Sequence, residues 1–280
     1  MGLTEKYVMI HADDAGLSHS QNQATIACLN KGMVNSCSIM VPCPGFEEMG
    51  TFAKQHPAYD YGIHLTLTCE WRDYKFGPVL PVDEVPSLVD ENGYFHETRK
   101  EVKTHARAEE VYKELKAQID KALHFGLHPT HLDSHMYSVG ATMEFFQVYR
   151  QLGKEYGLPV LINKKLLEMT GLNVDANIIS NDFEVEHAHF ATFNDFEKAH
   201  LKTFYMDVLD KITPGLHIIL IHPAFDDQEM KKITVDHPNF GSEWRQMDFD
   251  TFTAMETRHK LEENEIKLIT WKEISERLRG

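Results

Sequence analysis

The chain has 280 residues, of which 42% are hydrophobic and 25% charged, so it can form a full hydrophobic core in one large domain or two modest ones. Its 43 acidic and 28 basic residues give a formal net charge of -15, which argues against an extended nucleic-acid surface, because such surfaces need clustered lysine and arginine. The 17 histidines favour a metalloenzyme, since histidine is the commonest metal ligand.

Short apolar segments alternate with amphipathic ones along the first half of the chain. Apolar runs predict strands at 6–12, 34–41 and 59–67. Helical periodicity predicts helices at 18–31, 45–56 and 107–126, which end at Gly32, before Pro57 and at Gly126. The order of these elements is therefore strand, then helix, repeated.

The same alternation continues in the second half. Strands are predicted at 129–135, 158–163, 215–223 and 266–271, and helices at 141–157, 195–212 and 272–280. The segment 164–193 has no clear pattern, although 176–180 is a candidate strand. Seven or eight strands separated by helices predict a parallel sheet with outer helices. We expect one domain spanning 1–280 that forms an irregular, TIM-like (β/α) barrel, with an open doubly wound sheet as the alternative.

The segment 69–103 interrupts this alternation. It contains several prolines and glycines and little periodicity, which is typical of lids and binding loops, although it could equally be a plain surface excursion. Aromatic residues favour the lid, because exposed rings stack on the apolar faces of sugars. The candidates for substrate binding are Trp71, Tyr74 and Phe76, with Tyr94 and Phe95 nearby.

The cysteines and the N-terminus favour a cytoplasmic protein. The four cysteines form no Cys-x-x-Cys pair and lie in or directly beside predicted helices or strands, as buried apolar residues of a reducing compartment do; they are Cys28, Cys37, Cys43 and Cys69. The first strand begins without a basic and apolar leader, and no apolar run approaches about 18 residues. We therefore expect no membrane-spanning segment.

The polar residues that stand out lie within or just past the carboxyl ends of predicted strands. They are Asp13, Asp14, His64, His131, Asp133, His135 and His222. In a barrel or an open α/β sheet, active sites are built at this end. Each residue alone has an ordinary explanation, such as a helix cap, a buried core histidine or a solvated helix face. Their coincidence at one end of the sheet predicts a metal site.

Strand periodicity indicates which of these side chains point the same way. His131, Asp133 and His135 are two residues apart and would share one face of a strand. A bound cation accounts for polar residues on an inward face, because it neutralises a carboxylate and accepts imidazole lone pairs. With Asp14, His64 and His135 as ligands, coordination positions would remain open for water and substrate.

Other catalytic motifs are absent from the sequence. There is no His-Glu-x-x-His, Gly-x-Ser-x-Gly, Walker or Gly-x-Gly-x-x-Gly pattern. The pair His187-x-His189 falls in the poorly patterned region and is predicted to lie in a surface loop.

Four motifs in order resemble the YdjC-like carbohydrate deacetylases, the family of the chitooligosaccharide deacetylase. They are "MIHADDAGLSHSQNQAT", "GIHLTLT", "PTHLDSHMY" and "LIHPAF", and the resemblance runs over nearly the whole chain. It implies an irregular (β/α) barrel, one divalent cation and removal of N-acetyl groups from amino sugars or short chitobiose-like oligosaccharides. The expected partner is therefore a small N-acetylated sugar, with no nucleic acid and no membrane; a homo-oligomer is compatible with the sequence.

The resemblance also implies roles for single residues. Asp14, His64 and His135 look like the metal ligands, Asp13 is similar to the family's general base, and His222 looks like a candidate general acid. The chain departs from the family's pattern at Ala15, where phenylalanine is common, and at Tyr137, where a further histidine is common. Neither departure removes a proposed ligand, but both concern the acyl pocket and the sugar preference.

These roles give a mechanism for the adjacent aspartates. The cation would hold Asp14 and activate a water whose proton Asp13 takes, and His222 as imidazolium would protonate the departing amine. His131 and Asp133 would orient His135 or hold another catalytic group. Magnesium and zinc are the expected metals. The alternatives are another metal-dependent barrel hydrolase, of amidohydrolase or phosphoesterase type, and a non-catalytic sugar-binding protein.

Overall fold

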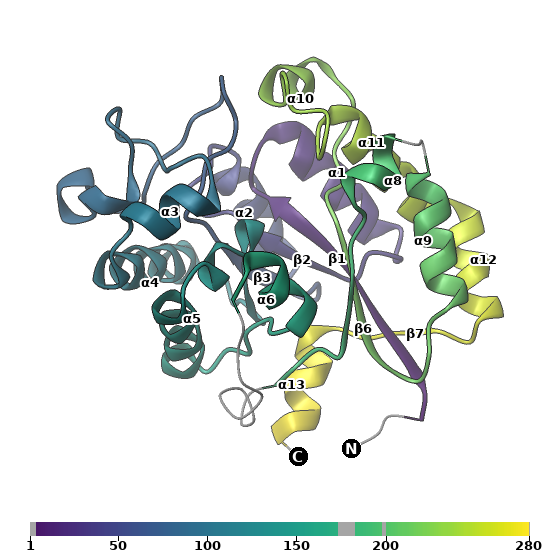
Figure 1. The fold of residues 1–280 in the computed structure, drawn as a ribbon. Helices are drawn as coiled ribbons and strands as arrows, with labels where there is room; N and C mark the ends of the chain where they lie inside the picture. Colours follow the sequence, from purple (N-terminus) through teal and green to yellow (C-terminus); the bar gives the residue numbers. More distant parts are fainter. Residues whose placement is uncertain (1–3, 173–182, 198–199, 280) are drawn as a thin grey trace.

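A computed structural model describes residues 4–172, 183–197 and 200–279, and its strands form one curved parallel sheet (Figure 1). The strand order is β4-β3-β2-β1-β6-β5, and β7 pairs with β1. The strands are β1 Lys6–Ala15, β2 Ser36–Ile39, β3 Tyr61–Leu65, β4 Leu132–Ser134, β5 His187–His189, β6 Gly215–Ile221 and β7 Lys267–Leu268. The sheet curls through 220° into a half-barrel, which confirms the predicted fold class.

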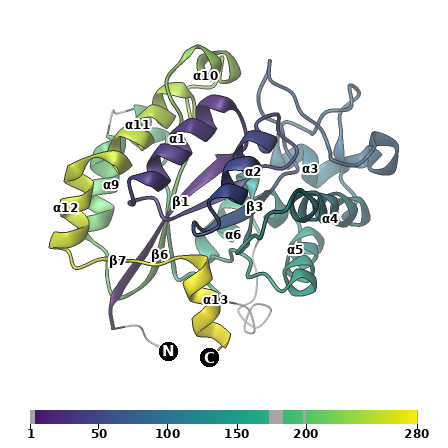
Figure 2. The same ribbon diagram turned by 180° about the vertical axis from the view of Figure 1, so that it is seen from behind.

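Helices cover the outside of the curved sheet, as Figures 1 and 2 show from opposite sides. Both described ends of the chain lie on the side of the sheet where β1 begins (Figure 1). The α-helices are α1 His19–Asn30, α2 Phe46–Gln55, α3 Arg99–His105, α4 Ala108–Phe125, α5 Met143–Tyr156, α6 Lys164–Thr170, α8 Phe193–Glu197, α9 Leu201–Asp210, α10 Gln228–Ile233, α11 Ser242–Thr253, α12 Met255–Glu263 and α13 Trp271–Arg279. Short 3-10 helices are η1 Val82–Glu84, η2 Pro86–Leu88 and η3 His135–Gly140.

Local sequence signals explain the helix boundaries. The hydroxyl of Ser18 accepts a hydrogen bond from Gln21 N and caps α1, as the sequence predicts. α4 ends at Gly126, which adopts the left-handed conformation that glycine accepts most easily. Nowhere in the described ranges does a helix combine the length and apolar character needed to cross a bilayer.

An irregular segment lies between β4 and β5, the two edge strands of the half-barrel. The predicted strand 158–163 is extended there but forms only an isolated bridge, between Leu132 and Val160. Backbone hydrogen bonds continue across this gap, from Leu161 N to Leu132 O and from Val185 N to Ile162 O, each 2.9 Å long. A short piece of extended chain therefore replaces a regular strand at this point.

Three other predicted segments have different outcomes in the structure. The pair His187-x-His189, predicted in a surface loop, forms β5, because it pairs in register with β6, His187 opposite His217. The predicted helix 195–212 is described as two helices, α8 and α9. The candidate strand 176–180 lies outside the described residues.

The segment 69–103 is fixed to α4 by buried carboxylates. Glu114 accepts hydrogen bonds from Val79 N and Leu80 N, and Glu110 accepts one from Ser87 N. These bonds satisfy backbone donors that a loop without regular structure would otherwise leave unpaired. The segment thus packs as an ordered excursion on α4.

Candidate active site

The two adjacent aspartates lie at the carboxyl end of β1. Asp14 has a left-handed backbone conformation, with φ at 64°, and the register between β1 and β2 shifts at this point. Aspartate tolerates this conformation better than most residues, and bulges of this kind re-aim side chains. Asp13 Oδ2 lies 3.6 Å from His222 Nε2, and Asp14 Oδ1 lies 3.0 Å from His135 Nδ1. Both carboxylates therefore reach one group of histidines.

Three buried side chains from different strands converge on one point. Asp14 belongs to β1, His64 to β3, and His135 directly follows β4. Asp14 Oδ1 lies 3.3 Å from His64 Nε2 and 3.0 Å from His135 Nδ1. The three groups offer ligand atoms within 4.8 Å of one another, a spacing that suits a metal ion. The structure thus brings together the residues predicted as ligands.

The outer nitrogen of each of these histidines faces a carboxylate. His64 Nδ1 lies 2.8 Å from Asp133 Oδ1, and His135 Nε2 lies 2.9 Å from Glu70 Oε2. If these nitrogens carry the protons and donate them, the inner nitrogens present lone pairs toward Asp14. Metal-binding histidines usually have such a carboxylate behind them. The donor set therefore fits a single divalent cation.

The second oxygen of Asp14 is held by a buried arginine. Arg245 Nη2 donates to Asp14 Oδ2 at 2.8 Å, and both side chains are about 1% exposed. Burial by itself would raise the pKa of Asp14, but the charges of His135 and Arg245 hold it well below its ordinary value. Asp14 is therefore an ionised carboxylate with one oxygen left for a cation.

The site contains more carboxylates than one arginine can balance. Asp13, Asp14 and Asp133 are buried, and Glu70 is largely shielded. In the metal-free chain, burial lowers the pKa of His135, but the carboxylates of Glu70 and Asp14 outweigh this and raise it to about 9. The site thus attracts positive charge, which a proton or a divalent cation can supply.

His11 contacts Asp13 and Asp133 from within the sheet, a role that was not predicted from the sequence. Its Nε2 lies 2.8 Å from Asp133 Oδ2 and 3.3 Å from Asp13 Oδ1, the latter an ion-pair contact rather than an aligned hydrogen bond, and its Nδ1 lies 2.9 Å from Ser36 Oγ. Burial would lower the pKa of His11, but the two carboxylates outweigh it and raise the pKa to about 9. The signal was available, because residues 11 and 13 lie two apart on one strand.

We expect the metal-free protein to lose stability between pH 6.5 and 9, partly through His11. Its pKa is raised on folding, so the stability it contributes is present below about 6.5 and lost as the pH rises through about 9. The loss is about 3 kcal/mol for His11. The free energy of unfolding of chelator-treated protein, measured with denaturant at both pH values, should show this loss. His11→Asn, which cannot be protonated, should reduce the difference; an unchanged difference would contradict the charge on His11.

His131 does not orient His135. Its Nδ1 lies 3.0 Å from Thr130 Oγ1, and its ring stacks on Trp271 with centroids 4.9 Å apart. Its Nε2 is 3.9 Å from Asp133 Oδ2 and packs over Gly62, where an added Cβ would lie 2.2 Å away. Burial holds the pKa of His131 well below its ordinary value, so the ring is neutral. Asp133 holds His64 and His11 instead of His135.

His222 lies just past β6 and faces Asp13. Its backbone N–H donates to Asp248 Oδ2 at 2.8 Å, and Tyr205 donates its hydroxyl to the other oxygen at 2.7 Å. Burial raises the pKa of Asp248 to about 7. Burial also lowers the pKa of His222 to about 4, against the opposing charges of Asp14 and Asp13. In the metal-free protein His222 is therefore neutral at pH 7, not the imidazolium expected from the sequence.

Two aromatic residues expected to bind substrate are buried. Trp71 is 1% exposed and Phe76 5%, so the expectation of exposed stacking rings is wrong for both. Trp71 lies under the guanidinium of Arg245, 5.4 Å from ring centroid to Cζ. Tyr74 is half-buried, and its hydroxyl donates to Leu17 O. Asp14, His64 and His135 form the ligand group, and from the segment 69–103 Glu70 contacts it, through His135.

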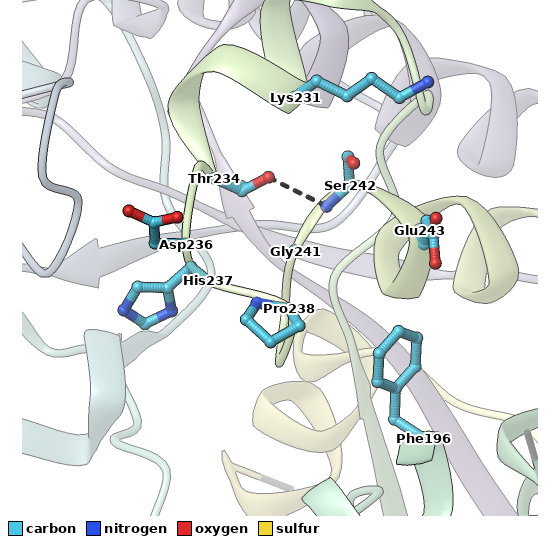
Figure 3. Close-up of a pocket in the computed structure, with 9 residues that line it drawn as sticks. All are labelled: Phe196, Lys231, Thr234, Asp236, His237, Pro238, Gly241, Ser242 and Glu243. Atoms are coloured by element: carbon cyan, nitrogen blue, oxygen red, sulfur yellow. Dashed lines mark hydrogen bonds between the residues drawn. The ribbon is translucent and has the colours of Figure 1, made fainter. Parts of the chain in front are cut away.

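A cavity of about 390 Å³ lies beside the loop between α10 and α11 (Figure 3). Its lining includes Phe196 from α8 and residues on the loop, namely Thr234, His237, Pro238 and Gly241. The residues of the ligand group and Asp13 do not line it. The cavity is therefore a neighbour of the site and not the site itself.

The chain shows extensive similarity to known proteins. The model of a family described as YdjC-like protein matches residues 7–263. A carbohydrate deacetylase of Thermus thermophilus is 33% identical, covering 99% of this chain and 97% of that protein. A carbohydrate deacetylase of Geobacillus stearothermophilus is 37% identical over 155 residues, 55% of this chain and 59% of that protein. A solved structure from Enterococcus faecalis matches with a TM-score of 0.78 and 26% identity, covering 96% of this chain and 99% of that chain.

Proposed function

Because the chain belongs to the YdjC-like family, we propose that it is a metal-dependent carbohydrate deacetylase that removes N-acetyl groups from amino sugars or short chitobiose-like oligosaccharides. One observation carries the proposal. Asp14, His64 and His135 turn one ligand atom each toward a common point while other side chains hold their remaining polar atoms. Asp13 and His222 lie beside that point.

The ligand set limits the choice of metal. One carboxylate oxygen and two imidazole nitrogens are typical of zinc and of manganese, cobalt or nickel. Magnesium prefers oxygen and would need waters to complete its octahedron. We propose one divalent cation, zinc or magnesium, bound by Asp14, His64 and His135. When bound, it supplies Lewis-acid polarisation of the acetyl carbonyl and lowers the pKa of an attacking water.

Residues of the chain would then carry out the proton transfers. Asp13 would accept the proton of the attacking water, because its carboxylate adjoins the ligand group and is partly accessible, with 12% of its side chain exposed. His222, 3.6 Å away and neutral in the metal-free chain, would relay a proton from Asp13 to the departing sugar amine. Arg245 keeps Asp14 ionised and oriented. His11, under Asp13 and Asp133, fixes the positions of both carboxylates.

Acetate release tests this function directly. Chelator-treated protein would be incubated with diacetylchitobiose and a panel of N-acetylated sugars, with and without added zinc or magnesium. We expect acetate release that depends on the metal. Stoichiometric metal binding without release from any sugar of the panel would refute the deacetylase function.

A further inference from the structure

Phe240 occupies an unusual backbone conformation next to the proposed acid. It lies in the loop between α10 and α11, with φ at 57°. Bulky residues rarely adopt positive φ, and such strained positions cluster at functional sites. The conformation persists only where the surrounding structure holds it in place.

Several bonds hold Phe240 there. Its carbonyl accepts a hydrogen bond from Arg245 Nε at 2.7 Å, and the same guanidinium binds Asp14. The loop is tightened by a bond from Ser242 N to Thr234 Oγ1 at 3.1 Å (Figure 3). At Gly241 an added Cβ would lie 2.2 Å from a loop carbonyl oxygen. The position of Phe240 is thus coupled to the ligand group through one arginine.

The ring of Phe240 links His222 to an exposed phenylalanine. It meets the His222 ring edge-on with centroids 4.9 Å apart and packs on Trp244 at 4.4 Å. The ring of Phe193 from α8 also meets it edge-on, with centroids 5.9 Å apart, and Phe193 is 54% exposed. Phe193 and Phe240 therefore form two aromatic steps from solvent to the proposed acid.

Phe193 and Phe240 can pack against a sugar, whereas the buried aromatic residues of 69–103 cannot. In the described parts of the chain, the exposed large aromatic side chains are Phe193 and Tyr94, which is 39% exposed. Only Phe193 of these two is connected through a ring contact to Phe240 and His222. The carbon-bound hydrogens of a sugar ring make an apolar face that packs against aromatic rings.

We infer that Phe240 and Phe193 form the sugar-binding platform, with Phe240 under the unit that carries the acetamido group and Phe193 under the next unit. The inference rests on the proposed function. The departing nitrogen must come within hydrogen-bond reach of His222, and its sugar ring is attached directly to it. That ring must therefore lie where Phe240 borders His222, and a second unit extends toward Phe193.

Sugar binding in a non-turnover background tests the platform. Calorimetry with metal-loaded Asp13→Asn protein would measure Kd for diacetylchitobiose and for N-acetylglucosamine. Adding Phe193→Ala should raise the Kd for the disaccharide about 3- to 10-fold and leave the Kd for the monosaccharide unchanged. Phe240→Gly should weaken both sugars, since glycine accepts the positive φ and removes only the ring. Phe240→Tyr should restore binding, and Tyr94→Ala, the matched exposed aromatic, should change neither sugar.

The outcomes separate the platform from the proposed function. If Phe193→Ala leaves the disaccharide affinity unchanged, or lowers the affinity for both sugars equally, Phe193 does not bind the second sugar unit. If Phe240→Gly leaves both affinities unchanged, Phe240 does not bind the unit that carries the acetamido group. Acetate release by the protein without any substitution is measured in parallel. Release with unaltered affinities in both variants refutes the platform alone, and Phe193-dependent binding without release refutes the deacetylase function alone.

Discussion

Asp13→Asn is expected to lower kcat for acetate release about 100- to 10,000-fold while the protein still binds its metal. Asparagine has the same shape but cannot accept a proton from water at neutral pH. Asp13 is not one of the three residues proposed as ligands, although its carboxylate reaches His11 and His222. Metal-dependent acetate release and calorimetric metal titration of the variant would measure the two properties separately.

Asp14→Asn is the matched control for Asp13→Asn. It changes the neighbouring carboxylate in the same way and leaves Arg245 without its anionic partner. We expect this variant to lose both metal binding and activity. A second group of side chains within ligand distance, Asp13 with His64 and Asp133, makes the comparison decisive. If Asp13→Asn loses the metal and Asp14→Asn keeps it, the assignments of the two aspartates are reversed.

The proximity of the three proposed ligands could be predicted because each of them lies in or directly after the end of a strand. Asp14, His64 and His135 follow apolar strand signals, and parallel strands bring their carboxyl ends to one edge. Arg245 could not be found this way. It lies 231 residues from Asp14 on α11, whose sequence pattern does not say which neighbour it faces. The contact arises from tertiary packing: α11 lies against α1 and α9, and Arg245 O accepts a hydrogen bond from Ala224 N, just past β6.

Burial in the irregular segments was the hardest property to predict. Trp71 and Phe76 lie in a segment without periodicity, so the sequence does not separate buried rings from exposed ones. In the structure Trp71 lies under Arg245, and Phe76 packs edge-on against the ring of Phe95 in the same segment. Exposure of Phe193 was missed for the same reason. Similarly, strand alternation predicted a parallel barrel, but the irregular segment between β4 and β5 is held by single long-range backbone hydrogen bonds.

Asp133→Asn should weaken metal binding about 10- to 100-fold, although Asp133 is not a proposed ligand. Its two oxygens accept from His64 Nδ1 and His11 Nε2, both at 2.8 Å. Burial opposes its charge, but the charge of His64 and the hydrogen bond from His11 hold its pKa well below the ordinary value. An amide is neutral and offers one acceptor oxygen to two imidazole N–H groups, so His64 either faces an amide N–H or competes with His11 for the oxygen. Calorimetric titration with zinc would measure the change.

The same substitution should also cost about 3–5 kcal/mol of unfolding free energy, because it leaves a buried charge without its partner. Asp60→Asn provides the matched control. Asp60 is also a buried aspartate, 3% exposed, but it accepts from Trp271 N and Lys272 N at the amino end of β3. Both variants should lose stability, whereas only Asp133→Asn should lose metal affinity. Equal metal affinity in the two variants would show that the carboxylate behind His64 does not tune the ligand, and that Asp133 serves the fold alone.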